Sequence, residues 1–218
     1  MKKTIISVCL SVTVTLLFAQ SNNPFKQRGE DLVASLGIIT ADPGFNPSNG
    51  FDQATIDRYK AMIPSKSDMN ESLAGEIVKT IKSPDFNFEK FVRESPLSVF
   101  SQDILLDVFN AGSGSKKGFS QKVTNAVNAV NANGTIERQE KELVLTLLSF
   151  AYEINNSPVA GLDRKKQHDC LVTGPDGTGT LPCWMLGAAA GAILGGQICG
   201  GPCAIGGAII GSIAGALS

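Results

Sequence analysis

The chain has 218 residues, 43% of them hydrophobic, and 19 Lys and Arg against 20 Asp and Glu, for a formal net charge of −1. No dense basic run is present, which excludes a nucleic-acid reader, because such a protein must neutralise a row of phosphates. The distribution is uneven: no Lys or Arg follows Lys166, whereas four of the five cysteines and more than half of the 23 glycines lie from Cys170 onward. Segments of different character are therefore expected along the chain.

Residues 1–19 have the pattern of a secretory signal peptide. Lys2 and Lys3 form a basic start, an apolar stretch runs from Thr4 to Phe18, and the small Ala19 precedes a polar run. An uncleaved anchor is disfavoured, because the stretch gives only about 23 Å of helix against a hydrocarbon core of about 30 Å. We expect cleavage near Ala19 and a protein that is secreted or held in the cell envelope, where cysteines form disulfides.

Residues 20–158 are predicted to form an all-α helical bundle of about seven helices. Their apolar residues recur at helical spacing, with almost no strict alternation. The expected inward-facing residues, helix by helix, are Leu32, Val33 and Leu36; Ile56, Tyr59 and Ile63; Leu73, Ile77 and Ile81; Phe88, Phe91 and Val92; Leu97, Phe100, Ile104 and Val108; Phe119, Val123, Val127 and Val130; and Ile136, Leu143, Leu147, Phe150 and Ile154. A chain of this length can bury a real core.

Local signals also predict where three of these helices begin. Asp68 and Glu71 have the spacing of a capping box before the third helix. Ser95 followed by Pro96 suggests an N-cap with proline in the first helical position. The last helix of the bundle is expected to begin at Thr135.

The helical bundle offers little catalytic chemistry. It contains no metalloprotease, P-loop or serine-hydrolase motif, and the single His of the chain, His168, lies beyond it. Acids at short spacing, such as Asp103 with Asp107, are more typical of a solvated helix face than of a catalytic pair. His168 beside Cys170 suggests a nucleophile or metal ligands only weakly, because loop neighbours seldom converge on one atom. We expect no catalytic residue, metal or cofactor.

Residues 159–182 are predicted to be a linker and a disulfide loop. The basic triplet Arg164, Lys165 and Lys166 is either a protease-sensitive site that would release Gln167 to Ser218, or a solvated charge run, which we favour. A third interpretation places the triplet at lipid headgroups.

The four cysteines outside the signal peptide allow three disulfide pairings. We favour Cys170 with Cys183, which closes a Gly- and Thr-rich loop, and Cys199 with Cys203, which staples a tight turn. A bond between Cys183 and Cys203 would require the far ends of a hairpin to meet.

Residues 183–218 are predicted to form an apolar hairpin of two helices with a glycine zipper. No charged residue occurs from Trp184 to the end of the chain. Glycines repeat every four residues on each side of the turn at Cys199 to Cys203, which places each set on one helix face where another backbone can approach closely. These glycines are Gly187, Gly191, Gly195, Gly207, Gly211 and Gly215.

The hairpin suggests two environments. Each helix is short for a membrane span, so the hairpin would insert partway, thin the bilayer or self-associate, with Trp184 at the interface. Alternatively, it packs against residues 20–158. We favour membrane lipid or self-association, because neither helix has a polar outer face.

A signal peptide, a helical region and a Cys- and Gly-rich apolar tail resemble secreted bacteriocin-type precursors and secreted bacterial proteins with glycine-zipper C-termini. The resemblance rests mainly on Cys170 to Ser218. It implies a membrane-active, toxin-like module held in check by the helical domain. The alternative is a non-lytic envelope protein that uses the tail as an anchor or oligomerisation element.

Overall fold

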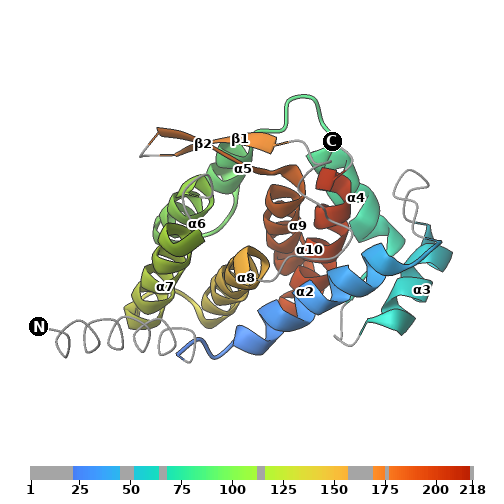
Figure 1. The fold of residues 1–218 in the computed structure, drawn as a ribbon, viewed down its shortest axis with the longest axis horizontal. Helices are drawn as coiled ribbons and strands as arrows, with labels where there is room; N and C mark the ends of the chain where they lie inside the picture. Colours follow the sequence, from blue (N-terminus) through green and yellow to red (C-terminus); the bar gives the residue numbers. More distant parts are fainter. Residues whose placement is uncertain are drawn as a thin grey trace, which may run out of the picture.

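The computed structural model describes residues 22–44, 52–63, 68–111, 116–156, 169–174 and 177–216. These residues form an all-α fold of nine helices with one small two-stranded sheet (Figure 1). The elements are α2 (Lys26–Ala41), α3 (Gln53–Met62), α4 (Glu71–Ile81), α5 (Phe88–Glu94), α6 (Val99–Asn110), α7 (Lys116–Ala132), α8 (Arg138–Asn156), β1 (Asp169–Gly174), β2 (Gly177–Pro182), α9 (Cys183–Cys199) and α10 (Gly201–Ala216). The predicted signal peptide and the basic triplet 164–166 lie outside the described residues.

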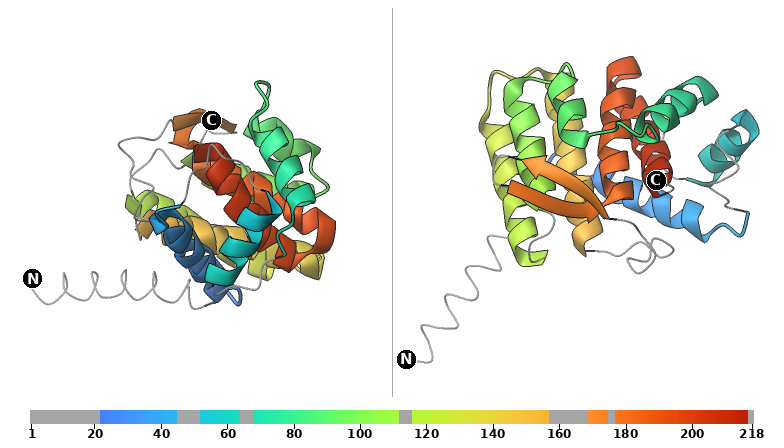
Figure 2. Two further views of the ribbon diagram at one scale, coloured as in Figure 1. Left: turned by 90° about the vertical axis from the view of Figure 1, so that its right-hand side faces the viewer. Right: turned by 90° about the horizontal axis from the view of Figure 1, so that it is seen from above.

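Helices α9 and α10 form the expected antiparallel hairpin, and the hairpin packs among the other helices. It contacts α2, α4, α5 and α8, and Figures 1 and 2 show it within the bundle, not projecting from it. Buried side chains of the hairpin, such as Ile193 and Ile210, belong to the same hydrophobic cluster as Leu36 and Leu147 of the surrounding helices. The described chain therefore has one shared core.

The all-α prediction is confirmed, and seven helices lie between residues 26 and 156, but two predicted caps are wrong. The N-cap of α4 is Asn70, whose side chain accepts a hydrogen bond from the Leu73 backbone at 2.9 Å. The N-cap of α6 is Ser98, whereas Ser95 caps the C-terminal end of α5. Both true caps have a short polar side chain that satisfies a free N–H of the first turn. Several such residues lie close together here, and spacing alone selected the wrong one.

The start of α8 and the buried face of α6 also differ from the prediction. Helix α8 begins at Arg138, because Asn133 accepts hydrogen bonds from the Thr135 backbone and hydroxyl and holds that segment in a turn. In α6, Leu105 and Phe109 are completely buried, whereas Phe100 and Ile104 are only partly buried. The inward face of α6 is therefore rotated relative to the predicted one. Val108 belongs to both faces and is fully buried.

The segment predicted as a disulfide loop contains a β-hairpin. Strands β1 and β2 pair antiparallel, with Asp169 opposite Pro182 and Gly174 opposite Gly177. The sheet contacts α5, α6 and α9. The segment packs against helices, so its backbone N–H and C=O groups need partners, and pairing of the two strands supplies them.

Candidate functional site: the glycine hairpin and its disulfides

The six glycines of the repeat lie in the seam between α9 and α10. A Cβ atom added to Gly191 would overlap the carbonyl group of Gly207, and one added to Gly207 would overlap that of Gly191. Gly187 and Gly211 have the same reciprocal relation. Each of these added Cβ atoms would lie less than 3.0 Å from the facing carbonyl group, a distance that real Cβ atoms essentially never show. The two backbones therefore touch directly, which only glycine permits at these positions.

The seam continues to both ends of the hairpin. A Cβ on Gly195 would overlap the Cys203 carbonyl group, and a Cβ on Gly215 would overlap that of Cys183. The predicted packing glycines thus contact the partner helix of the same hairpin. In this conformation their faces are occupied, so they are not open to a second molecule.

Other glycines on the hairpin contact the surrounding helices. A Cβ on Gly196 would lie 3.1 Å from the Leu143 side chain of α8, and one on Gly206 would lie 2.6 Å from Cγ of Met69, just before α4. Outside the hairpin, Gly29 likewise allows α2 to pack closely on α8, because a Cβ on Gly29 would overlap Ser149. The sequence pattern does not identify these three glycines, because none of them belongs to the repeat of four.

The turn of the hairpin is held by backbone hydrogen bonds and one special glycine. Gly200 has φ +76°, a conformation that L side chains rarely adopt. Its N–H donates to the Gly196 carbonyl at 3.0 Å, and its own carbonyl accepts from Ala204 at 3.0 Å. The N–H of Asp68 donates to the Pro202 carbonyl at 3.1 Å, which joins the turn to the segment before α4.

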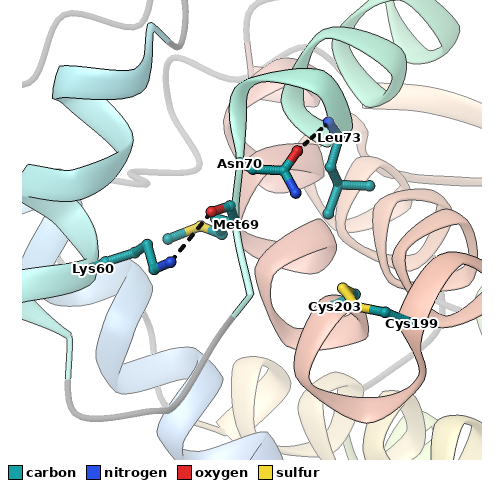
Figure 3. The surroundings of a disulfide bond; sticks show 6 residues. All are labelled: Lys60, Met69, Asn70, Leu73, Cys199 and Cys203. Carbon is teal, nitrogen blue, oxygen red and sulfur yellow. Dashed lines mark hydrogen bonds between the residues drawn. A yellow bond between two sulfur atoms is a disulfide. The ribbon is translucent and has the colours of Figure 1, made fainter.

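Both favoured disulfides are present. Cys170 is bonded to Cys183 with Cα atoms 4.9 Å apart, which connects β1 to the first residue of α9. Cys199 is bonded to Cys203 with Cα atoms 5.6 Å apart, across the turn of the hairpin (Figure 3). The pairing that the spacing favours is confirmed. Two disulfides indicate an oxidising, extracytoplasmic environment.

The carboxylate of Asp68 lies near the second disulfide. Its oxygen and the sulfurs of Cys199 and Cys203 are within 4.8 Å of one another, and this is the closest approach to a metal-binding group among the described residues. Zinc binds cysteine as thiolate, and these sulfurs are bonded to each other. In the disulfide form the group therefore lacks two thiolate ligands.

The acids that the sequence places at short spacing form ion pairs with cations of neighbouring turns or helices. Asp103 pairs with Arg93 at 2.6 Å, and Asp107 pairs with Lys122 at 2.7 Å. These pairs are solvent-exposed in part and contribute modestly to stability. Near the turn, Arg28 of α2 pairs with Glu142 of α8, beside Gly201.

Four side chains of the helical bundle have displaced pKa values with identifiable causes. A hydrogen bond to Glu30, and then the charge of Glu30, raise the pKa of Lys26. Partial burial, and then the charge of Glu30, raises the pKa of the Glu153 carboxyl group. Hydrogen bonds from the side chain and backbone of Thr55 lower the pKa of Asp52, the N-cap of α3. Burial, and then the charge of Asp42, raises the pKa of Tyr59. None of these groups belongs to the hairpin.

The uncharged hairpin is strongly buried. Trp184, predicted at a membrane interface, is 5% exposed, and Ile193 and Ile210 are inaccessible. Among the hairpin residues whose burial is described, the exposed ones lie at the turn, with Ile198 54% exposed. Among the described helices, none combines the length and apolarity needed to cross a membrane.

Comparisons with known proteins add no further assignment. No protein-family model, curated protein or solved structure matches the chain.

Proposed function

We propose that this is an exported, membrane-active protein that stores an apolar glycine hairpin inside a shell of amphipathic helices and delivers it to lipid. The observation that carries the proposal is the burial of two helices that lack any charged residue and any polar face. A helix that is apolar all round is stable either in a protein core or in lipid, so the same surface suits both environments.

The shell is suited to release the hairpin onto a membrane. Helix α4 packs against α10 and buries Leu73, Ala74 and Ile77, while it also carries exposed charged residues such as Glu76. An amphipathic helix can exchange a protein core for the membrane interface, where its apolar face remains buried and its charges stay in water. Opening of the shell would thus expose two kinds of lipid-binding surface together.

The dimensions of the hairpin set the mode of insertion. Helices α9 and α10 have 17 and 16 residues, and the longer of them spans about 26 Å, against a hydrocarbon core of about 30 Å. We therefore propose partial insertion as a hairpin, with local thinning of the bilayer or assembly of several copies. A bacteriocin-like or other toxin-like activity is the biological outcome that fits this mode.

The test uses the purified mature chain and dye-filled vesicles of phosphatidylglycerol or phosphatidylcholine. We expect co-sedimentation with vesicles and release of dye. Absence of both binding and release at every lipid composition would overturn the proposal.

A lock between shell and hairpin sharpens this test. A Cβ on Gly206 would lie 2.6 Å from Cγ of Met69, so Met69→Cys with Gly206→Cys places two cysteines at positions that pack directly against each other. Peptide mapping must show the new bond together with both native ones. The oxidised lock should abolish dye release, and the single variant Gly206→Cys serves as the unlocked control. Equal release by locked and unlocked protein would contradict release of α10 from α4.

The second candidate is a non-lytic envelope protein in which the hairpin serves as an anchor or oligomerisation element. The observation that favours it is the pair of disulfides, which fasten the hairpin at its turn and at its first residue. Stable retention on vesicles without dye release would favour this candidate over the first.

A further inference from the structure

The two disulfides differ in access. Cys199 is exposed at the end of α9, while its partner Cys203 is 2% exposed. In the other pair, Cys183 is 6% exposed and Cys170 is partly buried against the hydrophobic core. Exchange begins when an external thiolate reaches one sulfur of a disulfide, so exposure controls the rate. The hairpin turn therefore has the more exposed cysteine of the two pairs.

The leaving groups of the two pairs are well matched. Cys203 is the third residue of α10, and Cys183 is the first residue of α9. Both lie in the first turn of a helix, where free N–H groups and the helix dipole stabilise a thiolate. Access therefore distinguishes the pairs more than the stability of the departing thiolate does.

The turn does not depend on the Cys199–Cys203 bond alone. Backbone hydrogen bonds from Gly200 to Gly196 and from Ala204 to Gly200 span it, and Asp68 holds Pro202 from outside. The glycine seam continues along both helices. Breaking the sulfur bond therefore leaves the two helices packed, so exchange at this site does not require unfolding.

From these contacts we infer that Cys199 is a thiol-exchange site that reacts with an external dithiol. One thiolate of the dithiol attacks Sγ of Cys199 and forms a mixed disulfide, while the electron pair of the Cys199–Cys203 bond goes to Sγ of Cys203, which takes a proton from water. The second thiolate attacks the dithiol's own sulfur in the mixed disulfide and releases Cys199 as a thiolate. The dithiol is oxidised to a disulfide, and the pair is reduced by two electrons.

The carboxylate of Asp68 tunes this reaction. It lies within 4.8 Å of both sulfurs, so its negative charge opposes the incoming thiolate and the thiolate that forms on Cys203. Removal of the charge in Asp68→Asn should accelerate reduction by about threefold. An effect of charge should weaken as the salt concentration rises, which a local structural effect would not do.

The first experiment treats the oxidised full chain, without lipid, with dithiothreitol for increasing times. Free thiols are trapped with iodoacetamide, and peptides are quantified by mass spectrometry. Cys199 and Cys203 should be labelled about tenfold faster than Cys170 and Cys183. Equal rates, or earlier labelling of Cys170 and Cys183, would overturn the inference.

The second experiment compares how readily an external reagent reaches each of the two sulfurs. Cys203→Ser leaves Cys199 as a free thiol, and Cys199→Ser leaves Cys203; both are mixed with glutathione disulfide, and adducts are followed by intact mass. The Cys199 thiol should react about tenfold faster. Comparable rates would overturn the assignment to Cys199, and loss of helical circular dichroism on reduction of the wild-type turn would overturn exchange without unfolding. Neither readout depends on membrane activity.

Discussion

The hairpin of α9 and α10 and the shell formed by α2 to α8 use two different kinds of packing. In the hairpin, backbone meets backbone through glycines such as Gly191 and Gly207. In the shell, large side chains such as Phe109 and Phe150 fill the space between helices, and charges remain outside. Because helix interiors pay about 1 kcal/mol for each glycine relative to alanine, the seam is stable only while its partner surfaces are in place. Each helix of the hairpin therefore depends on the other for its stability.

The largest expected effect tests whether hairpin and shell unfold together. Phe109 is fully buried, and its ring lies 5.5 Å from that of Phe88. Phe109→Ala should lower the free energy of unfolding by about 4 kcal/mol, because it removes apolar contacts and leaves a cavity. Urea unfolding is followed by circular dichroism and by the fluorescence of Trp184, the single Trp of the chain.

Both probes should shift together, because the two regions share one core. A shift in circular dichroism with an unchanged Trp184 transition would show that the hairpin is an independent unit. Phe91→Ala, at a partly buried position, is the matched control and should have a smaller effect.

The next effect concerns the glycine seam. Gly191→Ala should lower the free energy of unfolding by about 3 kcal/mol, because its Cβ would overlap the Gly207 backbone and the helices must move apart. Gly75→Ala in α4 is the matched control, because a Cβ there meets nothing within 4 Å. The control should be stabilised by up to about 1 kcal/mol through helix propensity. Similar losses in both variants, measured by urea unfolding, would refute backbone contact as the cause.

The two disulfides should differ in their contributions to stability. Cys170 and Cys183 are separated by 13 positions, and Cys199 and Cys203 by 4. Closing the longer loop removes more freedom from the unfolded chain, so replacing the first pair by serine should cost about 3 kcal/mol and replacing the second about 2 kcal/mol. Denaturant unfolding of the two double variants measures the difference, and a reversed order would contradict it.

The smallest effect lies in the shell. The pKa of Glu153 is raised in the folded protein above the ordinary value of a glutamate, so the folded state binds more protons than the unfolded state. Stability from this group is therefore greatest below that value and declines as pH rises through the folded pKa. Glu153→Gln removes the decline, so it should stabilise the protein near neutral pH by less than about 1 kcal/mol, because the side chain is only partly buried and water screens its charge.

The check is the difference in unfolding free energy between Glu153→Gln and wild type at neutral pH and below the unfolded pKa. The gain should vanish at the lower pH. Asp52→Asn is a control of opposite sign, because the pKa of Asp52 is lowered and its contribution is lost as pH falls. A pH-independent gain in Glu153→Gln would contradict desolvation of the charge as the cause.

The sequence predicted the seven helices of the shell and both disulfides because these features depend on local spacing. Helical periodicity depends only on neighbours along the chain. Short loops hold two cysteines close together, so few alternative pairings remain. The helix caps were harder to predict from the sequence. Asn70 and Asp68 are both suitable N-caps for α4, and Ser98 and Ser95 are both suitable for α6. Which polar side chain meets a free N–H depends on backbone angles that composition does not specify.

The candidate site was predicted in part. Spacing identified the six seam glycines, but Gly29, Gly196 and Gly206 carry no periodic signal, because each is required by a neighbour distant in sequence. The β-hairpin was missed for a related reason. Its pairing of Cys170 with Leu181 is fixed partly by packing against helices and by the disulfide to Cys183, not by alternation of side chains.

By itself, the sequence determined that the end of the chain is an uncharged hairpin of two glycine-faced helices, stapled at its turn. Only the tertiary structure decided that the glycine faces meet each other and that α2, α4, α5 and α8 cover the rest. Periodicity specifies which residues share a helix face, and it carries no information on what that face contacts. The choice of partner is made by packing between segments far apart in the chain, where shape and burial decide.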